Sequence, residues 1–285
     1  MDPFARHIAA CNNLPSPAGY LPFRIGEAQV GWLEPEAARA LTFLPGQVHF
    51  GPDGVSLAAG PRGAAGRSGA LAEIARSLAR AGFGRIRGEE FDVRATPDGP
   101  VLGVVDRGVL PALGIISQGV HVNGLVRRPP GPGGGLHLWV GWRARDKAVA
   151  PGQMDNVVAG GIPAGLTPER CLVKEAEEEA SLPAPLAAQA RPAGRVSYIM
   201  RTDEGMRRDL LHVFDLEMPE GVVPRPNDDE VERFELWPIA RVMEAVRDTE
   251  SVKFNVNLVL IDLFLREGML EDGDGALRAG LNQLA

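Results

Sequence analysis

The sequence predicts an α/β protein made of two units, a small α+β unit followed by a larger α/β unit. The length of 285 residues allows one large or two modest domains. The first part places an amphipathic helix pattern between two hairpin patterns. The second part has alternating strands on both sides of a short acidic helix. We therefore expect a leader unit over residues 1–116 and a second unit over residues 117–285.

The first unit is expected to mix short helices with hairpins. Apolar residues at Leu71, Ile74 and Leu78 indicate one buried helix face, and two Pro-Asp-Gly triplets predict hairpin turns. The expected elements are a helix at 2–13, strand-like chain at 20–33, a helix at 34–41, a hairpin at 45–59, a small-residue loop at 64–69, a helix at 71–81, and a hairpin of 91–95 with 101–105. No catalytic group stands out here, and Asp106 and Arg107 are more typical of a surface pair than of a ligand contact.

The second unit is expected to be a strand-rich sheet with flanking helices. Period-2 alternation predicts its strands, and apolar runs of helical spacing predict its closing helices. The expected elements are strands at 119–127 and 136–143, a helix at 168–180, an antiparallel pair at 194–201 and 209–216, a strand at 232–238, helices at 239–246 and 254–266, and a terminal helix within 273–285.

Composition limits the classes of function. A formal net charge of −7 argues against general binding to nucleic acid or to a membrane surface. No apolar run is long enough for a membrane span, and the first residues lack the apolar core of a signal peptide. Two cysteines, Cys11 and Cys171, do not make a disulfide framework, so we expect a cytoplasmic protein.

The acidic helix carries the most specific chemical pattern in the chain. Thr167 can cap its start, Pro168 suits the first helical position, and the helix is expected to run to about residue 180. Glu175, Glu178 and Glu179 then share one face. Three carboxylates so close repel each other unless a cation lies among them, and such oxygen ligands suit Mg²⁺ or Mn²⁺. A solvated acidic face is the alternative reading.

Residues 160–182 resemble the Nudix box, G-x5-E-x7-R-E-U-x-E-E-x-G-U, in which U is a bulky aliphatic residue. Gly160 matches the first glycine, Glu175 the glutamate of the Arg-Glu pair, Glu178 and Glu179 the paired glutamates, and Leu182 the closing aliphatic residue. Leu166, Lys174 and Ser181 depart from the early glutamate, the arginine and the late glycine.

The resemblance implies an α/β/α sandwich with a mixed sheet, and a hydrolase that cleaves a diphosphate linked to another group. It implies that the three glutamates hold Mg²⁺ or Mn²⁺, with the Gly160 carbonyl completing the metal's ligands. A later carboxylate would be a ligand or general base, and Glu230 is favoured over Glu232. Lys174 is expected to pair with a carboxylate in place of the arginine.

The substrate is expected to be a small diphosphate. Arg201, Arg207 and Arg208 are candidates for contacting phosphate oxygens, and Tyr198 is a candidate for stacking on a flat ring. Core packing is the alternative for the tyrosine.

The segments at 22–26, 30–33, 106–108 and 119–126 resemble, diffusely, a Nudix subgroup that has a leader domain and is related to thiamine-pyrophosphokinase-associated proteins. That resemblance implies thiamine diphosphate or its oxidised forms as substrate, cut to the monophosphate. We also expect residues 1–115 to help close the pocket.

Three alternatives stay open at this stage. One is another Nudix substrate, such as a metabolite linked to a nucleoside diphosphate. The second is an isopentenyl-diphosphate isomerase, which is disfavoured because Ala159 stands where that enzyme needs a cysteine. The third is a catalytically silent binding or regulatory domain. A homodimer is possible by family analogy, although no sequence feature identifies an interface.

Overall fold

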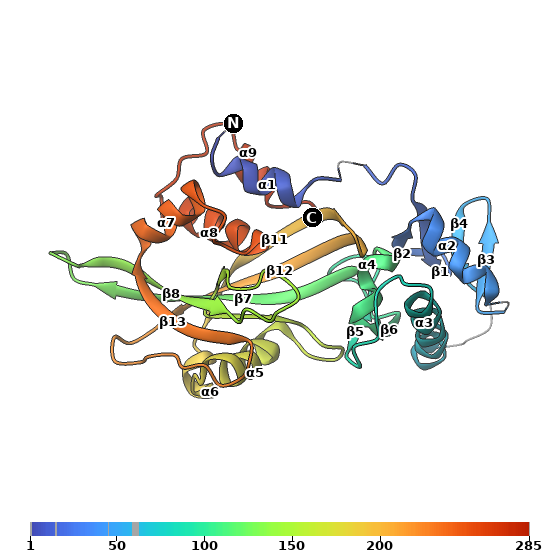
Figure 1. Ribbon diagram of the computed structural model, residues 1–285, viewed down its shortest axis with the longest axis horizontal. Coiled ribbons are helices and arrows are strands. Elements are labelled where there is room, and N and C mark those ends of the chain that lie inside the picture. Colours follow the sequence, from blue (N-terminus) through green and yellow to red (C-terminus); the bar gives the residue numbers. More distant parts are fainter. Residues whose placement is uncertain (1, 15, 45, 59–62, 285) are drawn as a thin grey trace.

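The computed structural model describes residues 2–14, 16–44, 46–58 and 63–284. A small unit with a four-stranded sheet lies at one end, and a larger sheet with helices on both faces forms the rest (Figure 1). The expected fold class, an α/β sandwich with a mixed sheet after a smaller α+β unit, is confirmed.

The first unit contains a sheet, a separate hairpin and a long helix. Its sheet has the strand order β2-β1-β4-β3, and β5 and β6 form the hairpin. The elements are α1 (Ala5–Cys11), β1 (Leu21–Ile25), β2 (Ala28–Leu33), α2 (Pro35–Ala40), η1 (Leu41–Phe43), β3 (Val48–Gly51), β4 (Gly54–Leu57), α3 (Gly63–Arg80), β5 (Glu90–Val93), β6 (Gly103–Asp106), η2 (Arg107–Val109) and α4 (Leu110–Leu113). Both predicted hairpins are confirmed, although residues 45 and 59 of the first lie outside the described residues.

One expectation for this unit is wrong, because residues 64–69 are not a loop but the start of α3. Alanine is a strong helix former and offsets the cost of the glycines in this stretch. Tertiary contacts also hold the first turns of α3 in place. The Ser68 hydroxyl accepts a hydrogen bond from the Val104 N–H (3.0 Å), and Arg67 donates to the Leu102 carbonyl (3.2 Å). Contacts with β6 therefore extend the helix beyond its apolar stripe.

The second unit is a mixed sheet with the strand order β11-β12-β7-β8-β13. Strands β12 and β7 run parallel, whereas the other neighbours are antiparallel. The elements are β7 (Ile116–Arg128), β8 (Gly135–Arg143), β9 (Met154–Asp155), β10 (Val158–Gly161), α5 (Pro168–Ala180), α6 (Ala184–Ala187), β11 (Arg191–Thr202), β12 (Gly205–Glu217), β13 (Val231–Pro238), α7 (Ile239–Asp248), α8 (Phe254–Arg266) and α9 (Ala276–Gly280). The sequence pattern did not predict β9 and β10, which pair with β8 and β7.

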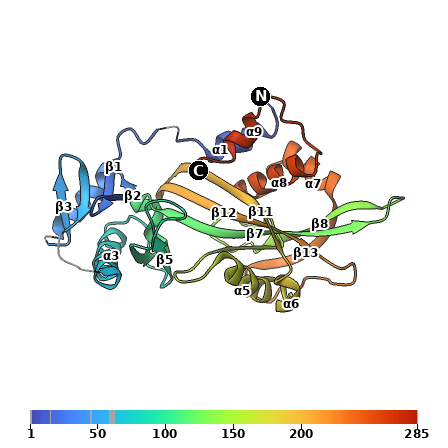
Figure 2. The same cartoon turned by 180° about the vertical axis from the view of Figure 1, so that it is seen from behind.

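Helices cover both faces of this sheet. Figures 1 and 2 place α5 and α6 on one face and α1, α7, α8 and α9 on the other. Two buried apolar clusters fill the two interfaces. None of the helices in the described residues is both long and apolar enough to cross a membrane.

The first helix packs on the second unit, although its residues were assigned to the leader. Phe4, Ile8 and Cys11 are buried in the same cluster as α8, and the rings of Phe4 and Phe264 meet edge to face with centroids 6.2 Å apart. The boundary at 116/117 falls at the start of β7 and stays a prediction. The chain thus crosses from the second unit's surface to the leader and back.

Helix α5 has the ends that its sequence predicts. The Thr167 hydroxyl accepts a hydrogen bond from the Arg170 N–H (3.3 Å), Pro168 is the first helical residue, and the helix ends at Ala180. Ser181 then adopts the left-handed conformation with φ 51°. Glycine is favoured there, which explains why the box carries a glycine at the position of Ser181.

Candidate active site

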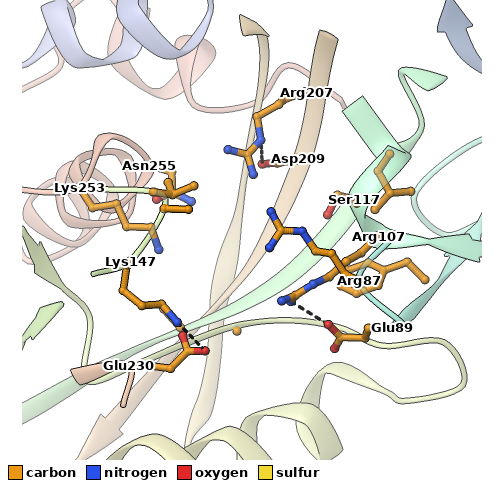
Figure 3. Close-up of a pocket in the computed structure, with 18 of the residues that line it drawn as sticks. Arg87, Glu89, Arg107, Ser117, Lys147, Arg207, Asp209, Glu230, Lys253 and Asn255 are labelled. Atoms are coloured by element: carbon orange, nitrogen blue, oxygen red, sulfur yellow. Dashed lines mark ion pairs between the residues drawn. The ribbon is translucent and has the colours of Figure 1, made fainter. Parts of the chain in front are cut away.

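A cavity of about 780 Å³ lies where the first unit meets α5 and the mixed sheet (Figure 3). Residues of both units line it, including Phe91 and Arg107 from the first and Glu175 and Arg207 from the second. The volume suits a small metabolite. The expectation that the leader contributes to the pocket agrees with this lining.

The three candidate glutamates of α5 all line this cavity. Glu179 is buried, and its Oε2 accepts a hydrogen bond from the Ala159 N–H at 3.0 Å. Burial raises the pKa of Glu179 well above the ordinary value, and the negative charges of Asp155, Glu175 and Glu230 add to the effect. A positive charge near Glu179 would relieve this cost.

Gly160 makes room for Glu175. A Cβ atom at Gly160 would lie 2.7 Å from both Cγ and Cδ of Glu175 and 2.8 Å from its Oε2. Strand β10 holds Gly160 in register with Val120 of β7. The absence of a side chain at Gly160 therefore lets the carboxylate of α5 lie directly against the strand backbone.

Lys174 pairs with two of the candidate ligands, as the sequence predicted. Its ammonium group donates to Glu175 Oε1 at 3.1 Å and also to Glu178 Oε2. Burial alone would lower the pKa of Lys174, but these hydrogen bonds raise it overall. Within the described part of the chain, no three Asp, Glu, His or Cys side chains converge as a ready metal site. The ammonium group lies where two carboxylates attract a cation.

Of the two candidates for the general base, Glu230 and Glu232, only one lines the cavity. Glu230 lines the cavity and pairs with Lys147 at 2.9 Å (Figure 3). Glu232 is not among the lining residues and contacts Arg145 (3.8 Å) and Arg233 (3.7 Å) instead. The structure thus brings Glu230, but not Glu232, to the glutamates of α5.

Only some of the residues predicted to contact the substrate reach the cavity. Arg207 and Arg208 line the cavity, whereas Arg201 and Tyr198 do not. Arg201 lies 3.6 Å from Glu34 at the surface. Tyr198 is fully buried and donates a hydrogen bond to the carboxylate of Asp209, in the packing role that was its alternative reading.

The arginines that reach the cavity are held by neighbours in the wall. Arg207 lies 3.6 Å from Asp209 and stacks over the Phe254 ring, with 5.7 Å from its Cζ to the ring centroid. Arg208 donates to the Gly114 carbonyl at 3.2 Å. Both side chains are therefore fixed in place before any substrate binds.

A buried ion-pair network supports the wall behind Glu179. Asp155 accepts hydrogen bonds from Arg143 (2.8 Å) and from Lys253 (2.9 Å), and both basic residues line the cavity. Burial acts to raise the pKa of Asp155, but the charges of Lys253, His121 and Arg143 lower it overall. Asp155 therefore stays ionised and holds the charged side chains of Arg143 and Lys253 at the rim of the cavity.

Several lining residues were missed by the sequence analysis. What they share is a place in the lining of the cavity, and they are Arg85, Arg87, Glu89, Phe91, Ser117, Lys147, Asp209, Lys253 and Asn255. One signal was present in the sequence. The run Arg85, Arg87, Glu89 alternates charged residues with a period of two, which puts them on one side of an extended segment.

Comparisons with known proteins identify both parts of the chain. The family model for the NUDIX domain matches residues 118–256, and a domain of unknown function, DUF4743, matches residues 3–117. Nudix hydrolase 20, chloroplastic, of Arabidopsis thaliana is 34% identical over 278 residues, which cover 94% of this chain and 73% of that protein.

Two further comparisons cover less. Nudix hydrolase 24, chloroplastic, of the same plant is 37% identical over 205 residues, 72% of this chain but only 55% of that protein. The crystal structure of DR0079 from Deinococcus radiodurans aligns with 61% of this chain and 98% of its own, at 21% identity and a TM-score of 0.46. The expected cytoplasmic location and homodimer stay predictions.

The extent of the match to Nudix hydrolase 20 assigns the family. This chain belongs to the Nudix hydrolases and is a hydrolase of pyrophosphate bonds.

Proposed function

We propose that this chain hydrolyses the diphosphate bond of a small metabolite in the cavity beside α5, with Mg²⁺ or Mn²⁺ bound by Glu175, Glu178 and Glu179. The observation that carries the proposal is the meeting of these carboxylates with a wall of basic side chains in one cavity. A diphosphate needs cations around it, and a divalent ion needs oxygen ligands. Nudix hydrolases in general need divalent metal ions, which the donor types here suit.

The residues present fit such an ion. Glu179 is a buried carboxylate with a raised pKa, and Glu175 lies against the Gly160 backbone, where a side chain would exclude it. Lys174 already places a positive charge between Glu175 and Glu178. Carboxylate and carbonyl oxygens are hard ligands that suit Mg²⁺ and Mn²⁺. The Gly160 carbonyl oxygen is a further candidate ligand by family analogy.

A bound divalent ion would neutralise the diphosphate and lower the pKa of a coordinated water. The protein's own groups would orient the substrate and accept the proton. Glu230 is the candidate general base, because it lines the cavity and its charge acts on Glu179. Lys147 holds Glu230 through their ion pair. Arg207 and Arg208 are the candidates for binding phosphate oxygens, because both reach the cavity.

For the substrate we propose thiamine diphosphate or one of its oxidised forms, released as the monophosphate. Two aromatic side chains, Phe91 and Phe254, line the cavity and can contact a flat ring. Nucleoside diphosphates linked to another group are the second candidate class, since the same aromatic and basic residues would suit them.

A hydrolysis assay with chromatographic separation of the products tests the function. The native chain is incubated with thiamine diphosphate, oxidised thiamine diphosphates, ADP-ribose and nucleoside triphosphates, with and without Mg²⁺ or Mn²⁺. Products are separated because thiamine diphosphate yields a monophosphate and free phosphate, whereas ADP-ribose yields two monophosphate esters and no free phosphate. We expect hydrolysis that depends on the metal and is fastest with a thiamine-type diphosphate. Hydrolysis of none of these compounds would favour the silent binding domain, and faster hydrolysis of ADP-ribose would favour the nucleotide-linked class.

A matched pair of variants tests the metal ligands. Glu178→Gln removes one candidate ligand, and we expect turnover to fall at least about 100-fold. Glu177→Gln changes an exposed neighbour that does not line the cavity, and it should turn over like the native chain. Both variants should keep the native melting temperature, because both side chains are accessible to solvent. Near-native turnover in Glu178→Gln would reject the metal assignment.

A further inference from the structure

We propose that the first unit binds the terminal phosphate of the substrate through Arg85, Arg87 and Arg107, so that the enzyme prefers diphosphates with one free end. This inference rests on the proposed function, because it names the part of the substrate that the leader recognises. It assigns a binding role to a domain whose family model carries none.

The three arginines reach the cavity from two segments of the first unit. In Figure 3, Arg87 and Arg107 extend into the cavity from one side, opposite Lys147 and Lys253. Arg107 pairs with Glu89 at 2.8 Å. In the described ranges, no carboxylate forms an ion pair with Arg85 or Arg87. Two guanidinium groups are thus available for an anion.

The backbone that carries these arginines is tightly built. The Asp106 carboxylate accepts hydrogen bonds from the N–H groups of Arg87 (3.0 Å), Gly88 (2.7 Å) and Gly108 (2.8 Å). The Arg85 N–H also donates to the Gly108 carbonyl at 3.3 Å. Asp106 is therefore a positioning residue that fixes two arginine-bearing segments side by side.

Two glycines permit this close approach. A Cβ at Gly108 would lie 1.8 Å from the Arg85 carbonyl oxygen, and a Cβ at Gly84 would lie 2.2 Å from the Gly108 carbonyl oxygen. Gly84 also has a φ of +81°, which favours glycine. Any larger residue at either position would push the two segments apart. The two glycines therefore keep the arginine-bearing segments in contact and the arginines close together.

The three guanidinium groups repel one another. Partial burial and the like charges of Arg85 and Arg107 lower the pKa of Arg87, and the opposite effect of Glu204 and Asp106 is smaller. Repulsion among like charges is unfavourable unless an anion compensates it. An anion bound at this wall would therefore be stabilised by the cluster.

One diphosphate can span the cluster and the acidic helix. Glu89, which pairs with Arg107, lines the same cavity as Glu175 of the acidic helix. The contact between the units is close, because a Cβ at Gly161 would lie 2.6 Å from Cζ of Phe91. The arginines therefore lie on the side of the cavity next to the candidate metal ligands.

A terminal phosphate fits this wall better than a phosphodiester. It presents three free oxygens and a charge of about −1.5 to −2 at neutral pH. A phosphodiester presents two free oxygens and a single charge. Guanidinium groups bind such oxygens in pairs, and the two unpaired ones here match the more highly charged group.

Isothermal calorimetry on the full chain in EDTA tests the proposal without requiring hydrolysis. The probes are inorganic pyrophosphate and the same ion with a methyl ester at each end. The native chain should bind free pyrophosphate at least tenfold more tightly than the blocked form. Arg87→Ala should weaken pyrophosphate binding about 10- to 100-fold and abolish the preference, whereas Arg87→Lys should restore part of it.

The control is Arg80→Ala, which removes an exposed arginine of the same unit that does not line the cavity. It should bind both probes like the native chain. Melting curves check folding, and Arg85→Ala provides a second variant of the cluster. Equal binding of the two probes, no measurable binding by the native chain, or native-like binding in both cluster variants would overturn the proposal. The two proposals can fail separately. Glu178→Gln should lose hydrolysis but keep native pyrophosphate binding in EDTA, because it changes a metal ligand and leaves the arginine cluster intact.

Discussion

Replacing Gly160 by alanine should displace a candidate metal ligand without unfolding the protein. The new Cβ would lie 2.7 Å from Cγ and Cδ of Glu175, about 0.7 Å inside the 3.4 Å at which ordinary contact begins. Glu175 is largely buried between strand and helix, so its carboxylate must move to a different position. A misplacement of about 1 Å costs roughly 100-fold in rate, and overpacking costs about 1–3 kcal/mol.

We therefore expect Gly160→Ala to lower kcat about 100-fold while its Tm falls by about 2–10 °C. The assay is metal-dependent phosphate release, with thermal unfolding measured on the same preparation. Gly221→Ala is the matched control, because a Cβ there meets nothing within 4 Å and its φ is not in the left-handed region. A kcat for Gly160→Ala within twofold of the control would refute the reasoning that Gly160 positions Glu175.

Three more predictions concern charges around the site. Asp155→Asn leaves the largely buried side chain of Lys253, which is 12% exposed, without its partner carboxylate. It should lower the free energy of unfolding by about 3 kcal/mol in denaturant titrations, and a loss below about 1 kcal/mol would contradict this. Burial and the charge of Lys253 lower the pKa of His121 from 6.5 to about 4. Between these two pH values the unfolded chain takes up a proton that the folded chain does not, so the free energy of unfolding is highest above pH 6.5 and falls by about 3 kcal/mol as the pH falls toward 4. His121→Gln should flatten the dependence of Tm on pH in that window, and an unchanged profile would count against it. Lys174→Gln removes the ammonium group that competes for Glu175 and Glu178, so calorimetry should show tighter Mn²⁺ binding, and weaker binding would indicate that Lys174 orients the ligands instead.

The acidic helix could be predicted closely because local rules fix it. Thr167 and Pro168 determine where α5 starts, and the helix ends at Ala180, as predicted. The spacing of the glutamates then follows from helical geometry, so their position on one face of α5 needed no tertiary information. The alternating strands and the Pro-Asp-Gly hairpin of β5 and β6 were predictable for the same reason.

Features that depend on tertiary contacts were not predictable. Residues 64–69 look like a loop by composition, yet hydrogen bonds from Arg67 and to Ser68 hold them in α3. Strand β10 is too short to show alternation and exists because β7 pairs with it. The alternation of Arg85, Arg87 and Glu89 puts them on one side of the chain, but their contact with the segment of Gly108 is a tertiary feature that no local pattern encodes.

Anomalous diffraction from Mn²⁺-soaked crystals tests the central claim most directly. We expect a peak within about 2.0–2.6 Å of carboxylate oxygens of Glu175, Glu178 and Glu179, with the Lys174 ammonium group moved away from its present bridge between Glu175 and Glu178. A peak elsewhere in the cavity, or Lys174 still bridging both carboxylates at saturating Mn²⁺, would contradict it.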